Sequence, residues 1–141
     1  MASIIEEFCE RLASIDSEDD ELMRQLYDAT SLIEDVTDIS HAFEPIFNFI
    51  EVNPEFDLGS PSPLVHLLEV HYPKYVPRLI ESLKSKPAYT TVFMLNRILN
   101  SDLASNIREQ YLSLLTGIAN NENTAPTVRK QAKEFYKHHT N

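Results

Sequence analysis

Apolar residues recur along the chain at steps of three and four positions, the spacing that places them on one face of an α-helix. The first series predicts a helix from about residue 4 to residue 15. A second helix is expected to start at Ser17 as N-cap and to run to about Asp35. The acidic run Glu18–Glu21 would then occupy its first turn, where carboxylates complement the helix dipole. The apolar positions are Ile4, Ile5, Phe8, Leu12 and Ile15, then Leu22, Leu26, Ala29, Leu32 and Ile33.

Prolines divide the middle of the chain into shorter helices. A phenylalanine-rich segment from about Ile39 to Glu51 predicts a largely buried third helix. We expect Pro45 to fall in its first turn, where the missing N–H has no intrahelical partner. Pro54 ends this segment, and Ser60 or Ser62 is expected to cap a fourth helix.

The next segment predicts two helices with different surroundings. One ends near Lys84–Lys86, where cations suit a helix C-terminus, and the next begins at Pro87. The short apolar run Thr91–Leu95 also fits a buried strand. We favour a helix because apolar residues continue at helical spacing to Leu99. Apolar residues occupy nearly every side of it, so we expect this helix to be the central one.

Two further helices are expected from about Leu103 to Ala119 and from Thr127 to His139. The chain therefore predicts an all-α fold of about seven to eight antiparallel helices, stacked as an α-solenoid over residues 1–141. Glycine usage agrees with this class. Gly59 and Gly117 are the only glycines, too few for the tight turns of a sheet protein.

Length and composition indicate one globular domain outside the membrane. The chain has 141 residues, and its longest apolar runs fall far short of the roughly 20 residues that cross a bilayer. Acidic residues stand near the N-terminus where a signal peptide would be basic. Cys9 is the single cysteine and cannot form an internal disulfide. We therefore expect a cytoplasmic protein.

The net charge of −10 is unevenly distributed. Residues 1–57 hold sixteen Asp and Glu against two Arg, a net charge of −14, and residues 58–141 hold six acids against ten Lys and Arg, a net charge of +4. The acidic N-terminal part repels nucleic acid and anionic lipid. It can accelerate association with a basic protein, or it can simply be a solvated face that aids solubility.

No sequence motif indicates an enzymatic reaction. The sequence lacks the nucleophile, phosphate-binding and zinc-protease patterns, and His66 and His71 would lie about 140° apart on a helix, too far around it to share a metal. We expect no catalytic residue, no cofactor-binding residue and no metal ligand. Arg97 lies within the apolar run VFMLNRIL, where a charge is costly unless it is paired, so we expect a carboxylate or several carbonyls as its partners. Asn96 either ties a neighbouring element to the core or lines a groove.

Two segments carry a family resemblance: Leu58–His66 (LGSPSPLVH) and Thr91–Asn100 (TVFMLNRILN). They resemble small all-helical immunity proteins of bacterial polymorphic-toxin and contact-dependent growth inhibition systems. The C-terminal PTVRKQAKEF also looks like a HEAT-like helix. The resemblance implies a non-catalytic cytoplasmic antidote that binds the C-terminal domain of a cognate toxin, often a basic nuclease, and occludes its active site or an exosite.

The charge pattern and the resemblance together suggest which residues meet the partner. An acidic surface can occupy a groove that evolved to hold a phosphate backbone. Two other interpretations stay open: a HEAT-like adaptor that binds a peptide or cellular protein in a groove near His66, Asn96 and Arg97, and a helical hydrolase. The carboxylates we expect to contact a toxin are Asp19, Asp20, Glu21, Glu34, Asp35 and Asp38.

Overall fold

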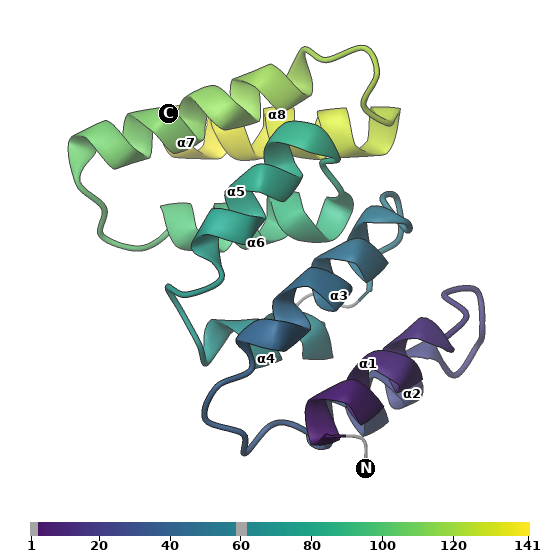
Figure 1. The fold of residues 1–141 in the computed structure, drawn as a ribbon. Coiled ribbons are helices and arrows are strands. Elements are labelled where there is room, and N and C mark those ends of the chain that lie inside the picture. Colours follow the sequence, from purple (N-terminus) through teal and green to yellow (C-terminus); the bar gives the residue numbers. More distant parts are fainter. Residues whose placement is uncertain (1–2, 59–61) are drawn as a thin grey trace.

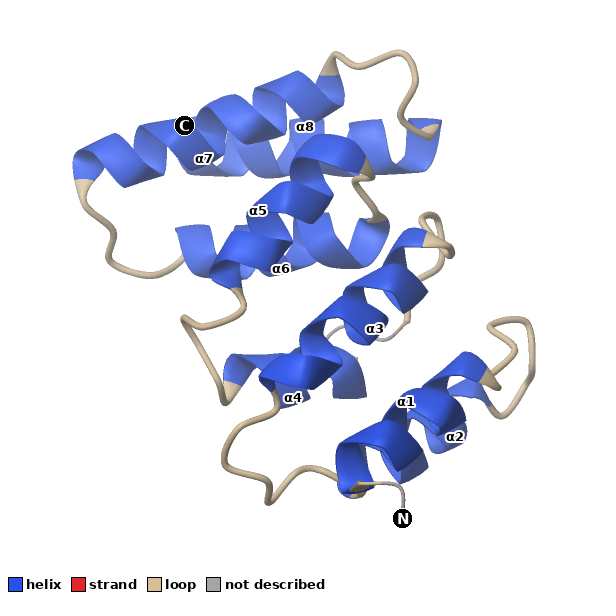
Figure 2. Ribbon diagram, in the orientation of Figure 1, coloured by secondary structure: helices blue, strands red, loops and turns tan. Residues whose placement is uncertain are grey.

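The computed structural model describes residues 3–58 and 62–141, and this part of the chain forms eight α-helices and no strand (Figure 1). Figure 2 shows the loops that join the helices. The predicted all-α fold of seven to eight antiparallel helices is confirmed. The helices are α1 (Ile4–Ala13), α2 (Leu22–Ser31), α3 (Ser40–Glu51), α4 (Pro63–Glu69), α5 (Val76–Ser85), α6 (Tyr89–Leu99), α7 (Ser105–Ala119) and α8 (Pro126–Thr140).

The helices stack in two layers. In one layer α3 packs between α1 and α5, and α5 also contacts α7. In the other layer α2 packs on α4 and α6 packs on α8. The pair α1 and α2 lies at one end of the stack, and the pair α7 and α8 lies at the other (Figure 1). The first helix pair, from the acidic part of the sequence, and the last pair, from the basic part, therefore lie at opposite ends of the stack.

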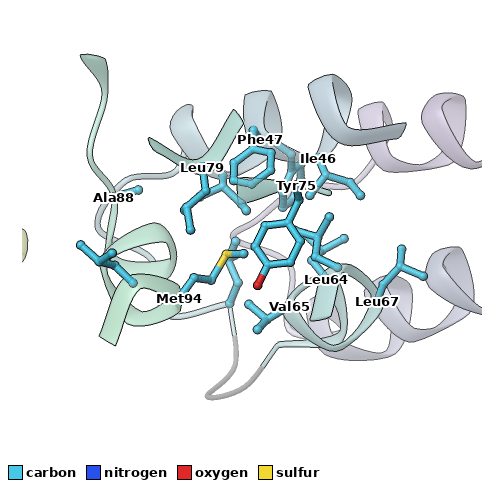
Figure 3. Packing of buried hydrophobic residues seen from close by; sticks show 14 of the residues in the cluster. Ile46, Phe47, Leu64, Val65, Leu67, Tyr75, Leu79, Ala88 and Met94 are labelled. Atoms are coloured by element: carbon cyan, nitrogen blue, oxygen red, sulfur yellow. The ribbon is translucent and has the colours of Figure 1, made fainter. Parts of the chain in front are cut away.

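A single buried hydrophobic cluster takes side chains from all eight helices. Figure 3 shows its middle, where Ile46 and Phe47 of α3 lie near Tyr75, Leu79 and Met94. Each fully buried side chain of this kind contributes about 1.5–3 kcal/mol relative to leaving it exposed. Within the described residues, no helix is both long and apolar enough to cross a membrane.

The second helix differs from the prediction at both ends. It begins at Leu22, and Ser17 is not its N-cap. Instead the Ser17 hydroxyl donates a hydrogen bond to the Asn53 side chain, just after α3. The acidic run Glu18–Glu21 forms turns ahead of the helix instead of its first turn. After Ser31 the chain continues in turns to residue 35, where helix was expected.

Pro45 lies inside α3, beyond the first turn where it was expected. It lacks the N–H that would otherwise bond to the carbonyl of His41, four residues earlier. Because His41 is exposed, water can replace the missing donor. The remaining buried residues of α3 hold the helix in place despite this break: Ala42, Ile46, Phe47, Phe49 and Ile50.

The predicted cap of the fourth helix is confirmed, and the segment Thr91–Leu95 forms a helix and not a strand. Ser62 is the N-cap of α4, and its hydroxyl oxygen accepts a hydrogen bond from the backbone N–H of Val65 at 3.1 Å. The alternative cap, Ser60, lies outside the described residues. Helix α6 contacts α5, α7 and α8. Apolar residues were expected on nearly every side of it, but its buried residues cover one broad face and Phe93, Asn96 and Arg97 lie on the opposite one. The buried residues are Thr90, Thr91, Val92, Met94, Leu95, Ile98 and Leu99.

Candidate functional site

The carboxylates predicted to contact a partner lie on the turns that flank α2. All six are exposed, and we call them the acidic face. Because the ten residues of α2 span about 15 Å, the structure separates them into two groups at opposite ends of the helix. Three precede the helix and three follow it: Asp19, Asp20 and Glu21, then Glu34, Asp35 and Asp38.

The first group is held by its own backbone. The Asp16 carboxylate accepts a hydrogen bond from the backbone N–H of Glu18 at 2.9 Å, and the Asp19 carboxylate accepts one from Glu21 at 2.8 Å. Short aspartate side chains form such turns because they reach backbone donors two residues onward. Asp20 lies between these turns and is exposed. These hydrogen bonds therefore fix the backbone of the turns, and the turns expose their carboxylates to solvent.

In the second group, Asp38 lies just ahead of the third helix, whose N-cap is Ile39. Its carboxylate accepts a hydrogen bond from the backbone N–H of Ser40 at 2.9 Å. This bond is the largest cause that lowers the pKa of Asp38, and the charges of Lys74 and His41 lower it further. Asp38 therefore keeps its negative charge into more acidic solution than an unperturbed aspartate.

An ion-pair cluster on α2 was not predicted from the sequence. Arg24 bonds Glu21 at 2.5 Å and Asp28 at 3.0 Å. The hydrogen bond to Glu21 is the main cause that raises the pKa of Arg24. The spacing of three and four residues was the available signal, since such positions are neighbours on a helix. Arg24 thus partly neutralises the charge of Glu21. Most of the unpaired negative charge of the acidic face therefore lies on the other five carboxylates.

A shallow groove between α2 and α4, which we call the Tyr27 groove, adjoins the second group. It has a volume of about 180 Å³. The side chains of Tyr27 and Val70 on its walls are 56% and 77% exposed. Glu34 is the member of the acidic face that lines it, and its other walls include Pro63, His66 and Leu67. Sequence analysis missed this groove, because it joins helices whose packing was not predicted.

Arg97 lies at the surface of the molecule and not within the core. Its side chain is 39% exposed, and its guanidinium forms two hydrogen bonds to Glu69, at 2.6 and 2.9 Å. The expected carboxylate partner is therefore present, and hydrogen bonding to it raises the pKa of Arg97. The α6 face that points outward places the arginine there despite its apolar neighbours in sequence. The guanidinium also lies over the Phe93 ring, 5.7 Å from its centre.

The residues considered for an adaptor groove are not gathered around one hollow. Asn96 bonds the His139 ring of α8 at 2.7 Å, so it ties two helices together. Burial is the main cause that lowers the pKa of this histidine. His66 lines the Tyr27 groove, whereas Arg97 lines a separate hollow with Tyr72.

A second arginine cluster, absent from the sequence predictions, joins α3 to α5. Arg78 bonds Glu44 at 2.6 Å and Glu51 at 3.0 Å, and its guanidinium lies 5.3 Å from the centre of the Phe47 ring. Burial lowers the pKa of Arg78, but its bonds to both carboxylates outweigh that effect and raise it. Its partners lie about 30 residues away, a separation at which no local sequence pattern reveals the contact. We call this group the Arg78 clamp.

The described surface offers groups that suit the binding of cations. The acidic face and the Tyr27 groove combine carboxylates with an exposed aromatic ring, and both bind positively charged side chains. Over residues 3–58 and 62–141, no three His, Cys, Asp or Glu side chains gather closely enough to hold a metal ion. Comparisons with family models, curated proteins and solved structures find no match to this chain.

Proposed function

We propose that this chain is a cytoplasmic immunity protein that binds the C-terminal domain of a cognate toxin, a basic nuclease, and neutralises it by occluding the active site or an exosite. The observation that carries the proposal is the exposure of every carboxylate of the acidic face. Residues 16–38 hold nine acids against Arg24 alone, a net charge of −8. The resemblance of residues 58–66 and 91–100 to immunity proteins supports the same role.

The electrostatic reasoning links this surface to a nuclease. A nuclease cleft is lined with cations that hold phosphates, and carboxylates on a rigid surface can take the place of those phosphates. The exposed lysines of α8 lie at the far end of the stack, where they do not cancel the acidic field (Figure 1). A field of this kind raises association rates by about 10- to 1,000-fold at low salt and is screened as salt rises.

The proposal expects the gene directly upstream to encode the toxin. The test is co-purification with that toxin domain, followed by measurement of the association rate across a salt titration. The variant D20K/D35K reverses two exposed charges of the acidic face. The matched control E122K/E134K makes the same change in net charge on exposed residues near the basic end. We expect D20K/D35K to associate at least about tenfold more slowly at low salt and to lose protection of growing cells, and the control to change by less than about twofold.

Three outcomes distinguish the acidic-face mechanism, the immunity function and the adaptor interpretation. Equal effects of the two variants, or an association rate indifferent to salt, would contradict the acidic-face mechanism. Absence of binding by the unmodified chain would contradict the immunity function and favour the adaptor interpretation. Loss of binding in D20K/D35K alone supports the proposal, provided that circular dichroism shows both variants folded.

A further inference from the structure

The chain twice builds the same three-part arrangement from its own residues. In the Arg78 clamp, a guanidinium lies over the Phe47 ring and bonds carboxylates. On α6, Arg97 lies over the Phe93 ring and forms two bonds to Glu69. An arginine suits both contacts at once, because its planar guanidinium stacks on a ring while its N–H groups point at a carboxylate.

The Tyr27 groove contains two of these three parts. The exposed Tyr27 ring and the exposed Glu34 carboxylate both line it. Among residues 3–58 and 62–141, no side chain bonds Glu34 and no cation lies over Tyr27. The nearby Arg24 does not fill the role, since Glu21 and Asp28 hold its guanidinium.

The size and the walls of the groove indicate what kind of group fits. Its volume of about 180 Å³ lies below the roughly 300–1,000 Å³ of sites that hold a drug-sized molecule. One long side chain is a better match. The apolar walls Pro63, Leu67 and Val70 suit the methylene stem of that side chain, while the ring and the carboxylate suit its charged end.

We propose that the Tyr27 groove receives an arginine side chain of the protein partner, whose guanidinium stacks on Tyr27 and pairs with Glu34. This inference rests on the proposed function and adds the position on which the toxin domain is anchored. Charge complementarity supports it: in the part of the chain that the structure describes, no Lys or Arg side chain forms an ion pair with Glu34 or Asp35, and the charges of Lys74 and His41 act on Asp38. Arg97 of α6 is already paired with Glu69 of α4 and lines a separate hollow.

The experiment measures the dissociation constant for the toxin domain encoded directly upstream, using full-length variants of this chain. Y27A removes the ring and E34Q removes the charge with little change in shape. Each is expected to weaken binding by about 30-fold, the loss typical of a central anchor. Y27F keeps the ring and is expected to bind within about threefold of the unmodified chain.

The chain supplies a close control for each change. Val70 and Val52 both follow the last residue of a helix, α4 and α3, and are 77% and 74% exposed. V70K adds a positive charge to the groove wall, where it repels an incoming guanidinium, and V52K adds the same charge on the other layer. We expect V70K to weaken binding at least about tenfold more than V52K. E10Q, on exposed Glu10 of α1, controls for the loss of a charge in E34Q.

The outcomes distinguish this inference from the proposed function. Weakened binding in Y27A, E34Q and V70K with unchanged binding in Y27F, V52K and E10Q supports the groove. If the unmodified chain binds the toxin domain and the groove variants bind equally well, the groove inference is wrong and the immunity function stands. If the unmodified chain does not bind the domain, both fail together. A loss in Y27F equal to that in Y27A also contradicts the stacked guanidinium, because it traces binding to the hydroxyl.

Discussion

The Arg78 clamp allows a prediction about how burial changes the contribution of an ion pair to the free energy of unfolding. Replacing Arg78 with methionine keeps much of the stem but removes the guanidinium. The side chain of Arg78 is 14% exposed, and that of its partner Glu51 is 7% exposed, so R78M leaves a nearly buried carboxylate without its cation. Arg97 provides the comparison, because its pair with Glu69 has the same chemistry at 39% and 26% exposure.

The magnitude follows from this difference in burial. Removing one partner of a fully buried pair costs about 3–5 kcal/mol, whereas exposed pairs are worth about 0–1 kcal/mol. The second partner, Glu44, is 65% exposed and keeps access to water, which reduces the loss. We therefore expect R78M to lower the free energy of unfolding by about 2–3 kcal/mol and R97M by less than about 1 kcal/mol. The larger loss is a substantial part of the roughly 5–15 kcal/mol that stabilises a typical domain.

Urea unfolding followed by circular dichroism at the helical band measures both values. The double variant R78M/E51Q removes the orphaned charge and should recover at least about half of the loss, because a neutral amide is cheaper to bury than a carboxylate. If R78M proved no more destabilising than R97M, burial would not be what gives the clamp its strength. Failure of E51Q to restore stability would show that the cost comes from lost packing on Phe47 instead.

Three other predictions concern stability. Burial raises the pKa of Tyr75 to about 12 from 10.0. The neutral Tyr75 side chain therefore contributes its full stabilisation below pH 10, and this contribution is lost as the pH rises to 12. The unfolding free energy should fall by up to about 2 kcal/mol more across that window in the unmodified chain than in Y75F, and equal slopes would contradict this. S62A removes the buried cap of α4 and should cost about 1–2 kcal/mol in urea unfolding; no loss would show that the cap is dispensable. G117A should raise stability by about 0.5–1 kcal/mol, because an added Cβ meets nothing within 4 Å inside α7; a lower melting temperature would refute it.

The helices could be predicted from sequence because their apolar residues repeat with the helical period. The spacing in Thr91–Leu99 was enough to identify the central helix, although the run is also compatible with a strand. The start of α2 could not be predicted in the same way. Ser17 has the chemistry of a cap, but a contact with Asn53, distant in sequence, engages its hydroxyl. The local tendency of a serine to cap a helix is overridden when a residue distant in sequence binds the same hydroxyl.

In the candidate site, too, features that depend on single residues could be predicted, whereas features that depend on helix packing could not. The exposure of Asp20 and Asp35 needed only their polarity to be anticipated. The Tyr27 groove needed the packing of α2 on α4, and the Arg78 clamp needed α3 beside α5, neither of which a single sequence encodes in a short pattern. The apolar run around Arg97 predicted that its charge needs a partner, but that partner, Glu69 of α4, is 28 residues away in sequence and no local pattern identifies it.

The separation of charge along the stack also makes the molecule an electric dipole. Acidic turns around α2 mark one pole, and the exposed Lys130, Lys133 and Lys137 of α8 lie at the other (Figure 1). A dipole experiences a torque in the field of a charged partner, so a basic protein selects the orientation of approach before any contact forms. The same poles attract those of neighbouring copies at low ionic strength, and such head-to-tail contacts can propagate into open chains. Sedimentation at each salt concentration therefore belongs with any kinetic titration of this protein.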